Sequence, residues 1–76
     1  MNVLRNSKME KIGVGSIVKS TEEFNKKCKT EEQDSGYYVP FKGVKVKYIS
    51  AGAGDVTVFA NGYDRTHDVK WVELDK

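Results

Sequence analysis

The fold of this chain is decided by the stretch from Tyr37 to Leu74, which reads YYVPFKGVKVKYISAGAGDVTVFANGYDRTHDVKWVEL. In segment 44–49 apolar residues alternate with lysines. A period of two puts successive side chains on opposite faces, so this segment is expected to be a strand with one face on a core and the other in water. Segments 55–60 and 68–74 are also rich in β-forming residues. Together the three segments predict an antiparallel meander.

The connections between these strands contain small residues. Segment 50–54 (SAGAG) has no bulky side chain and is expected to be a hairpin connection. Asn61 and Gly62 tolerate the positive φ of a type I′ turn and predict the next hairpin. An alternative places that turn at 64–66, with Gly62 as a bulge. In the last strand the apolar positions change faces, so a bulge near Trp71 or a barrel corner is expected.

Before the meander, segment 16–19 (SIVK) predicts a short first strand. Ser20 and Glu23 then have the spacing of a capping box, in which each side chain satisfies a backbone N–H of the other residue. This pattern predicts a helix that runs to about Glu32 and stops at 34–36.

Phe24 and Cys28 would share one face of that helix, because residues four apart are neighbours on a helix surface. These two are the only strong apolar anchors between residues 20 and 32. The alternative is therefore a long irregular loop, with Phe24 as its anchor in the core.

Residues 1–12 are polar and weakly patterned. They are expected to form either a short helical turn or a loose, flexible arm. With 76 residues in all, the chain has room for one domain, which is assigned to residues 13–76.

The chain has 13 basic and 11 acidic residues, a net charge of +2, which does not by itself indicate a nucleic-acid partner. Cys28 is the only cysteine, so no internal disulfide can form and a reducing cytosol is the expected environment. No apolar run approaches the roughly 20 residues of a membrane-spanning helix. The expectation is a cytoplasmic protein with no membrane partner.

The order of short strand, long connection and three-stranded meander resembles the Src-homology 3-like small β-barrels, including Tudor-type domains. The opening Gly15–Lys19 and the ending Asp68–Leu74 carry this resemblance, and Phe41–Lys47 is similar to part of the KOW domains. The resemblance covers residues 13–74. It implies a mostly β fold: a single small antiparallel barrel with a short helix or long loop between the first two strands. The Trp-Trp pair of the peptide-binding members is missing, and the fold transfers no activity.

The residue types needed for catalysis are sparse. His67 is the only histidine and is expected to be a solvated residue in a turn, with nothing in the spacing that pairs it with Cys28. One cysteine and one histidine cannot supply a closed tetrahedral zinc site. Segment 52–54 lacks the Lys-Ser/Thr of a phosphate-binding loop. We therefore expect a protein without catalytic residues, metal or cofactor, and not an enzyme.

Aromatic residues suggest binding to a larger protein, because aromatic side chains dominate interface hot spots. In so small a domain Trp71 is expected to be buried. The residues expected at the protein-binding surface are Tyr37, Tyr38, Phe41 and Tyr63.

Lysines near this stretch suggest a nucleic-acid-binding module as the alternative. Lys42, Lys45 and Lys47 would contact phosphates, with Tyr48 or its aromatic neighbours stacking on bases. The competing interpretation is a solvated strand face that guards an edge against aggregation. The sequence leaves the partner and the oligomeric state open.

Overall fold

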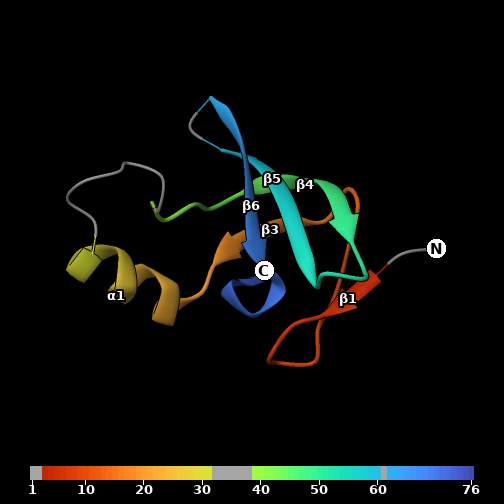
Figure 1. Cartoon of the computed structure of the whole chain (residues 1–76), viewed down its shortest axis with the longest axis horizontal. Helices are drawn as coiled ribbons and strands as arrows, with labels where there is room; N and C mark the ends of the chain where they lie inside the picture. Colours follow the sequence, from red (N-terminus) through yellow and green to blue (C-terminus); the bar gives the residue numbers. More distant parts are fainter. Residues whose placement is uncertain (1–2, 32–38, 61) are drawn as a thin grey trace.

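The computed structural model describes residues 3–31, 39–60 and 62–76, with the side chains of 29–31 left out. The fold is mostly β, as expected, with one α-helix (Figure 1). In chain order the elements are β1 (Val3–Arg5), β2 (Lys11–Gly13), β3 (Ile17–Ser20), α1 (Glu22–Glu31), β4 (Val44–Ser50), β5 (Asp55–Ala60), β6 (Tyr63–Asp68), the 3₁₀ helix η2 (Val69–Trp71) and β7 (Val72–Leu74).

The larger sheet has the strand order β6-β5-β4-β3-β7, and every neighbouring pair is antiparallel. The last strand therefore returns to lie beside β3, the first strand of this sheet. As expected, α1 lies between the first two strands of this sheet along the chain. Within the described residues β6 and β7 do not pair with each other, so the sheet is not closed into a barrel.

The N-terminal residues form a second, two-stranded sheet in which Leu4 pairs with Ile12. This hairpin is neither the helical turn nor the loose arm expected from the sequence. The boundary expected after residue 12 falls inside β2, and Ile12 is fully buried in the core. The hairpin has no clear periodic signal in the sequence, because each of its strands has only three residues.

The hairpin also covers the outer edge of β7 with side chains. Asn6 Nδ2 donates a hydrogen bond to the carbonyl of Val72 (2.9 Å), and Glu10 Oε1 accepts one from the Leu74 N–H (3.1 Å). Lys8 forms an ion pair with Glu73 between these two contacts. An exposed sheet edge can pair with another chain, and these polar contacts use backbone groups that would otherwise remain open on β7.

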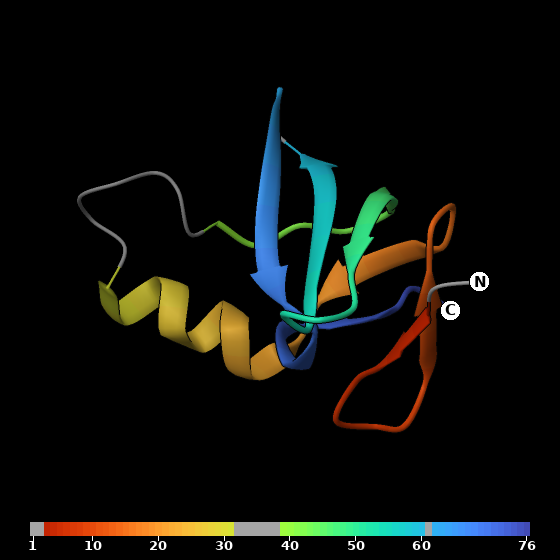
Figure 2. The same ribbon diagram turned by 45° about the vertical axis from the view of Figure 1, so that its right-hand side comes forward.

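Helix α1 extends away from the sheet and is anchored near its start (Figure 2). Phe24 and Cys28 are both buried, which confirms the predicted apolar face. The predicted capping box is wrong by one residue: Thr21 Oγ1 accepts the N–H of Phe24 (3.2 Å). Ser20 instead accepts the N–H of Phe41 (3.0 Å) and thereby fastens segment 39–43 to β3.

The β5–β6 hairpin confirms the turn predicted at 61–62, since Ala60 pairs with Tyr63 and Gly62 has a φ of 85°. The alternative turn at 64–66 is wrong, because those residues lie within β6. The expectation of a continuous strand over 68–74 is also wrong for its first half. Residues 69–71 form η2, which Asp68 caps by accepting the N–H of Lys70 (3.0 Å).

Strand β4 contains an irregularity that changes its exposed face. Its register against β5 shifts between Val46 and Tyr48. Val46 is buried as expected, but Tyr48 is 59% exposed, although the simple alternation placed it on the core side. The core itself consists of Ile12, Val18, Phe24, Cys28, Phe41, Val46, Val56, Val58, Ala60 and Val72.

Candidate functional site

On one side of the larger sheet lies an aromatic cluster of three buried residues, Phe24, Phe41 and His67, and the half-buried Trp71. Phe24 is its centre: its ring centroid lies 5.0 Å from that of His67 and 5.8 Å from that of Trp71. Phe41 stacks on His67 at 5.2 Å. Trp71 is half-buried, and Lys70 Nζ lies 5.0 Å from its centroid.

This arrangement corrects two predictions. His67 is not a solvated turn residue, since it lies in β6 and is 5% exposed. Phe41 is 6% exposed and is therefore a core residue; it does not belong to an exposed protein-binding surface. The alternation of buried and exposed residues along β6 cannot be recognised in the sequence YDRTHD, because Arg65 and His67 on the inward side are as polar as their outward neighbours.

The environment of His67 favours the neutral imidazole. Burial lowers the pKa of His67, and the positive charge of Arg65 lowers it further. A general base must reach its substrate. This imidazole is enclosed by aromatic rings and lines neither of the two cavities described below. The geometry therefore gives His67 a packing role.

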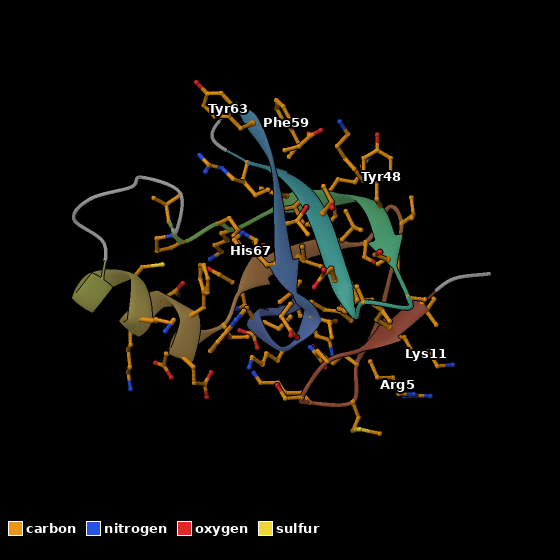
Figure 3. All side chains as sticks on the ribbon, viewed as in Figure 1. Arg5, Lys11, Tyr48, Phe59, Tyr63 and His67 are labelled. Carbon is orange, nitrogen blue, oxygen red and sulfur yellow. The ribbon has the colours of Figure 1, made fainter. Side chains whose placement is uncertain are left out.

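The opposite side of the sheet carries exposed apolar side chains. Tyr48 on β4 is 59% exposed, and Phe59 on β5 is 52% exposed (Figure 3). Ile17 on β3 is also exposed and pairs with Lys45. We define the outer face as Ile17, Lys45, Lys47, Tyr48, Phe59 and Asp64.

Lys47 connects the members of the outer face. Its Nζ lies 5.7 Å from the ring centroids of both Tyr48 and Phe59. It also lies 3.0 Å and 3.2 Å from the two carboxylate oxygens of Asp64, across β5. The hydrogen bond with Asp64 raises the pKa of Lys47. One cation thus contacts both rings and links β4 to β6, although the pair is exposed and adds little stability.

Tyr63 is 67% exposed, as its predicted binding role requires, but it does not belong to the outer face. It pairs with the buried Ala60, so alternation puts it on the same side of β6 as Arg65 and His67. Arg65 lies over its ring at 5.3 Å, near the tip of the hairpin. Tyr37 and Tyr38 lie outside the described residues.

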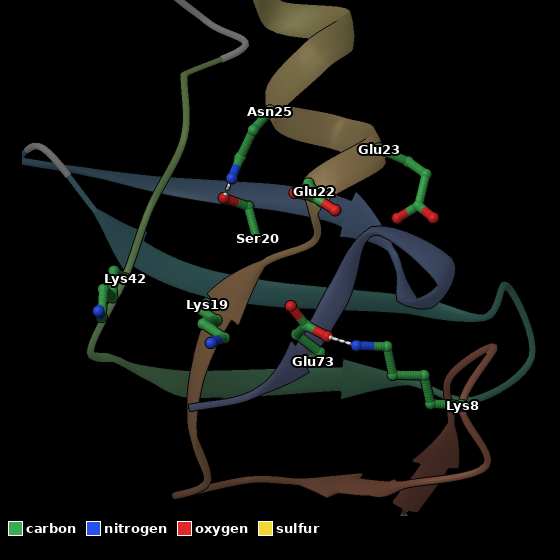
Figure 4. A pocket seen from close by; sticks show the side chains of 8 residues that line it. All are labelled: Lys8, Lys19, Ser20, Glu22, Glu23, Asn25, Lys42 and Glu73. Atoms are coloured by element: carbon green, nitrogen blue, oxygen red, sulfur yellow. Dashed lines mark hydrogen bonds and ion pairs between the residues drawn. The ribbon is translucent and has the colours of Figure 1, made fainter. Parts of the chain in front are cut away.

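Lys42 is separated from the other two lysines of the predicted nucleic-acid site. It lines a polar groove that also contains Lys19, Ser20 and Asn25 (Figure 4). The groove consists of two adjoining cavities of about 560 and 280 Å³. Lys45 and Lys47, by contrast, lie on the outer face with Tyr48.

Four of the side chains that line the polar groove interact with one another in two pairs. Ser20 Oγ lies 2.6 Å from the side-chain amide of Asn25, and Glu73 is paired with Lys8. Glu22 and Glu23 complete its wall. With lysines and glutamates intermixed, the groove has no dominant charge that would select an anion or a cation.

Neither the fold nor the comparisons assign a chemical activity. No group of three or more metal-ligating side chains occurs among the residues that the structure describes. Over the same residues, no helix has the length and apolar character needed to cross a membrane. The chain matches no protein-family model, and neither the curated proteins nor the solved structures gave a significant match.

Three residues of the outer face, Ile17, Phe59 and Asp64, were not predicted from the sequence. The signal for Phe59 was present: in segment 55–60, Val56 and Val58 alternate with Thr57 and Phe59. A period of two predicts that Phe59 faces away from the valines. For Ile17 no comparable signal exists, because β3 has only four residues.

Proposed function

We propose that this protein is a non-catalytic accessory or regulatory module that docks on a larger protein through its outer face. The observation that carries the proposal is the pair of exposed rings, Tyr48 and Phe59, held beside Lys47 on the larger sheet. Exposed aromatic side chains on a rigid scaffold are suited to be interface anchors, since little conformational entropy is lost when they are covered.

The arrangement of the strands supports the resemblance to SH3-like domains. The last strand, β7, returns to pair with β3, and α1 lies in the connection between β3 and β4. We propose this fold type for residues 17–74, the span of the larger sheet and α1, since the boundary expected after residue 12 divides β2. Because such folds carry many unrelated functions, the docking proposal rests on the outer face and not on the fold.

Site-specific photo-crosslinking in the native host tests the docking proposal. A photoreactive phenylalanine analogue at position 59 should yield an adduct much heavier than two copies of this chain, and nuclease should not remove it. The same analogue at Lys26, an exposed position on α1, is the matched control and should give no such adduct. Equal heavy adducts from both positions, or none from position 59, would contradict the proposal.

Nucleic-acid binding is the second candidate, because Lys45 and Lys47 share the outer face with Tyr48. Phosphate contacts make affinity fall steeply with salt, while stacking on aromatic rings is less salt-dependent. Fluorescence anisotropy with single-stranded RNA and DNA, at low and at moderate salt, measures the affinity and its salt dependence. Salt-sensitive binding that Lys45→Glu abolishes would favour this candidate over protein docking.

A further inference from the structure

The charges of the outer face are ordered across the strands. Lys45 and Lys47 lie on β4, and the exposed ring of Phe59 lies on β5. Asp64 lies on β6, directly opposite Phe59 in the register. The sequence of side chains across the sheet is therefore basic, apolar, acidic.

Such a face is complementary to itself when it is turned over. A twofold axis that lies in the contact plane and runs along β5 brings β4 of one copy opposite β6 of the other. Lys45 and Lys47 then meet the second copy's Asp64, while Phe59 meets its own counterpart. An isologous contact of this type brings opposite charges together at both edges, and it adds Lys45 of the second copy to an Asp64 that Lys47 of its own chain already contacts. A partner whose surface carries charges of only one sign would be attracted at one edge of the outer face and repelled at the other.

We propose that a second copy of this chain covers the outer face, so that the protein is a homodimer when no larger partner is present. Lys45 supports this arrangement, because it makes no ion pair within the part of the chain that the structure describes. The charge of Lys45 is thus available to the second copy. The larger partner and the second copy would then compete for the outer face, so that dimerisation would block docking. This competition rests on the proposed docking function.

Charge reversal in the purified 76-residue chain tests the dimer. By sedimentation equilibrium over a dilution series, the wild type should approach twice the 8.6 kDa of one chain. Lys45→Glu places two acidic groups opposite each other, and Asp64→Lys places like positive charges opposite each other. Each single variant should dimerise about tenfold more weakly or worse. An equimolar mixture of the two variants should recover a dimer, because Glu at 45 then faces Lys at 64.

Two sets of control variants test whether a loss of dimerisation has a cause other than the outer face. Lys26→Glu and Glu22→Lys make the same charge changes on α1, so each should remain as dimeric as the wild type. Phe59→Ser should abolish the dimer, and at a concentration where both proteins are monomeric it should unfold within a few degrees of the wild type, since the ring is exposed in the single chain. A wild type that stays monomeric at every concentration would overturn the proposal, as would a mixture that fails to associate. The docking proposal would survive either result, because it is measured by the heavy adduct at position 59.

Discussion

The two sides of the larger sheet use aromatic residues in opposite ways. On the core side, Phe24 is 1% exposed and contacts the rings of Phe41, His67 and Trp71. On the outer face, Phe59 is 52% exposed and its neighbour is a lysine ammonium group. The difference shows that residue type alone does not determine a role: only the buried ring removes its full apolar surface from water, and only the exposed ring is available to a partner.

Removal of one ring from each side gives the largest contrast in stability. Phe24→Ala leaves a cavity at the centre of the buried aromatic cluster and should lower the free energy of unfolding by about 3–5 kcal/mol. A loss of this size approaches the whole stability expected of a small domain. At a concentration where the chain is monomeric, Phe59→Ala should change it by no more than about 0.5 kcal/mol. Urea denaturation followed by circular dichroism measures both.

The result for Phe59→Ala decides whether the two sides really differ. If that variant lost as much stability as Phe24→Ala, the ring would contribute to the core and the outer face would not be a free surface. A modest gain in solubility with unchanged unfolding would agree with an exposed ring whose role is in binding.

The attachment of segment 39–43 to the core side depends on Ser20. Its hydroxyl accepts the N–H of Phe41 and also lies 3.1 Å from the carbonyl oxygen of the same residue. Ser20→Ala leaves a buried N–H without its acceptor and should cost about 1–3 kcal/mol in the free energy of unfolding.

Thr21→Ala is the matched variant one residue away. It removes only the N-cap of α1 and should cost about 1 kcal/mol. Amide hydrogen exchange separates the two effects. Ser20→Ala should speed exchange at Phe41, whereas Thr21→Ala should do so in the first turn of α1. If Thr21→Ala proved neutral while Ser20→Ala frayed the helix, the capping box expected from the sequence would be correct after all.

Sequence reasoning succeeded where side-chain periodicity was strong and local. The strand at 44–49, the turn at 61–62 and the shared face of Phe24 and Cys28 all follow from spacing alone. It failed at His67, because a polar residue on the inward side of a strand is indistinguishable from one on the outward side until its packing partners are known. Phe24, one of those partners, is 43 positions earlier in the chain.

The outer face was predictable only in part, for a related reason. Lys45 and Lys47 were expected to be exposed, and they are. Tyr48 joined them only because the register of β4 shifts after Val46, and no glycine or other local signal marks that irregularity. The pairing of Lys47 with Asp64 spans 17 positions and two hairpin turns. Such a contact is determined by sheet topology and not by local sequence.

The burial of His67 on the core side predicts that the free energy of unfolding depends on pH. Because burial holds the pKa of folded His67 below its ordinary value of 6.5, the unfolded chain binds the proton more readily. The neutral form of His67 therefore contributes its full share to the free energy of unfolding above pH 6.5, the pKa of the unfolded chain. This share is lost as the pH falls from 6.5 through the lower pKa of the folded chain. The slope can be no steeper than about 1.4 kcal/mol per pH unit.

Urea denaturation at a series of pH values between 5 and 8 measures this slope. His67→Gln removes the titrating group, so the stability of that variant should be nearly flat above about pH 6. Nearer pH 5 the lowered pKa of folded Glu10 adds a slope of the same sign in both proteins, and subtracting the curve of the variant from that of the wild type removes it. A variant as pH-sensitive as the wild type would mean that another group controls the acid response.

The smallest expected effect concerns the ion pair of the outer face. Lys47 and Asp64 are both largely exposed, so a double-mutant cycle with Lys47→Ala and Asp64→Ala should give a coupling free energy of about 0.2–1 kcal/mol. That energy should decrease with added salt, because salt screens exposed charges. The cycle must be measured at a concentration where the chain is monomeric, since a second copy would add its own Asp64 to the same lysine. A coupling that grows with protein concentration would reveal that contact directly, and a coupling of several kcal/mol in the monomer would show that the outer face is structural rather than available for binding.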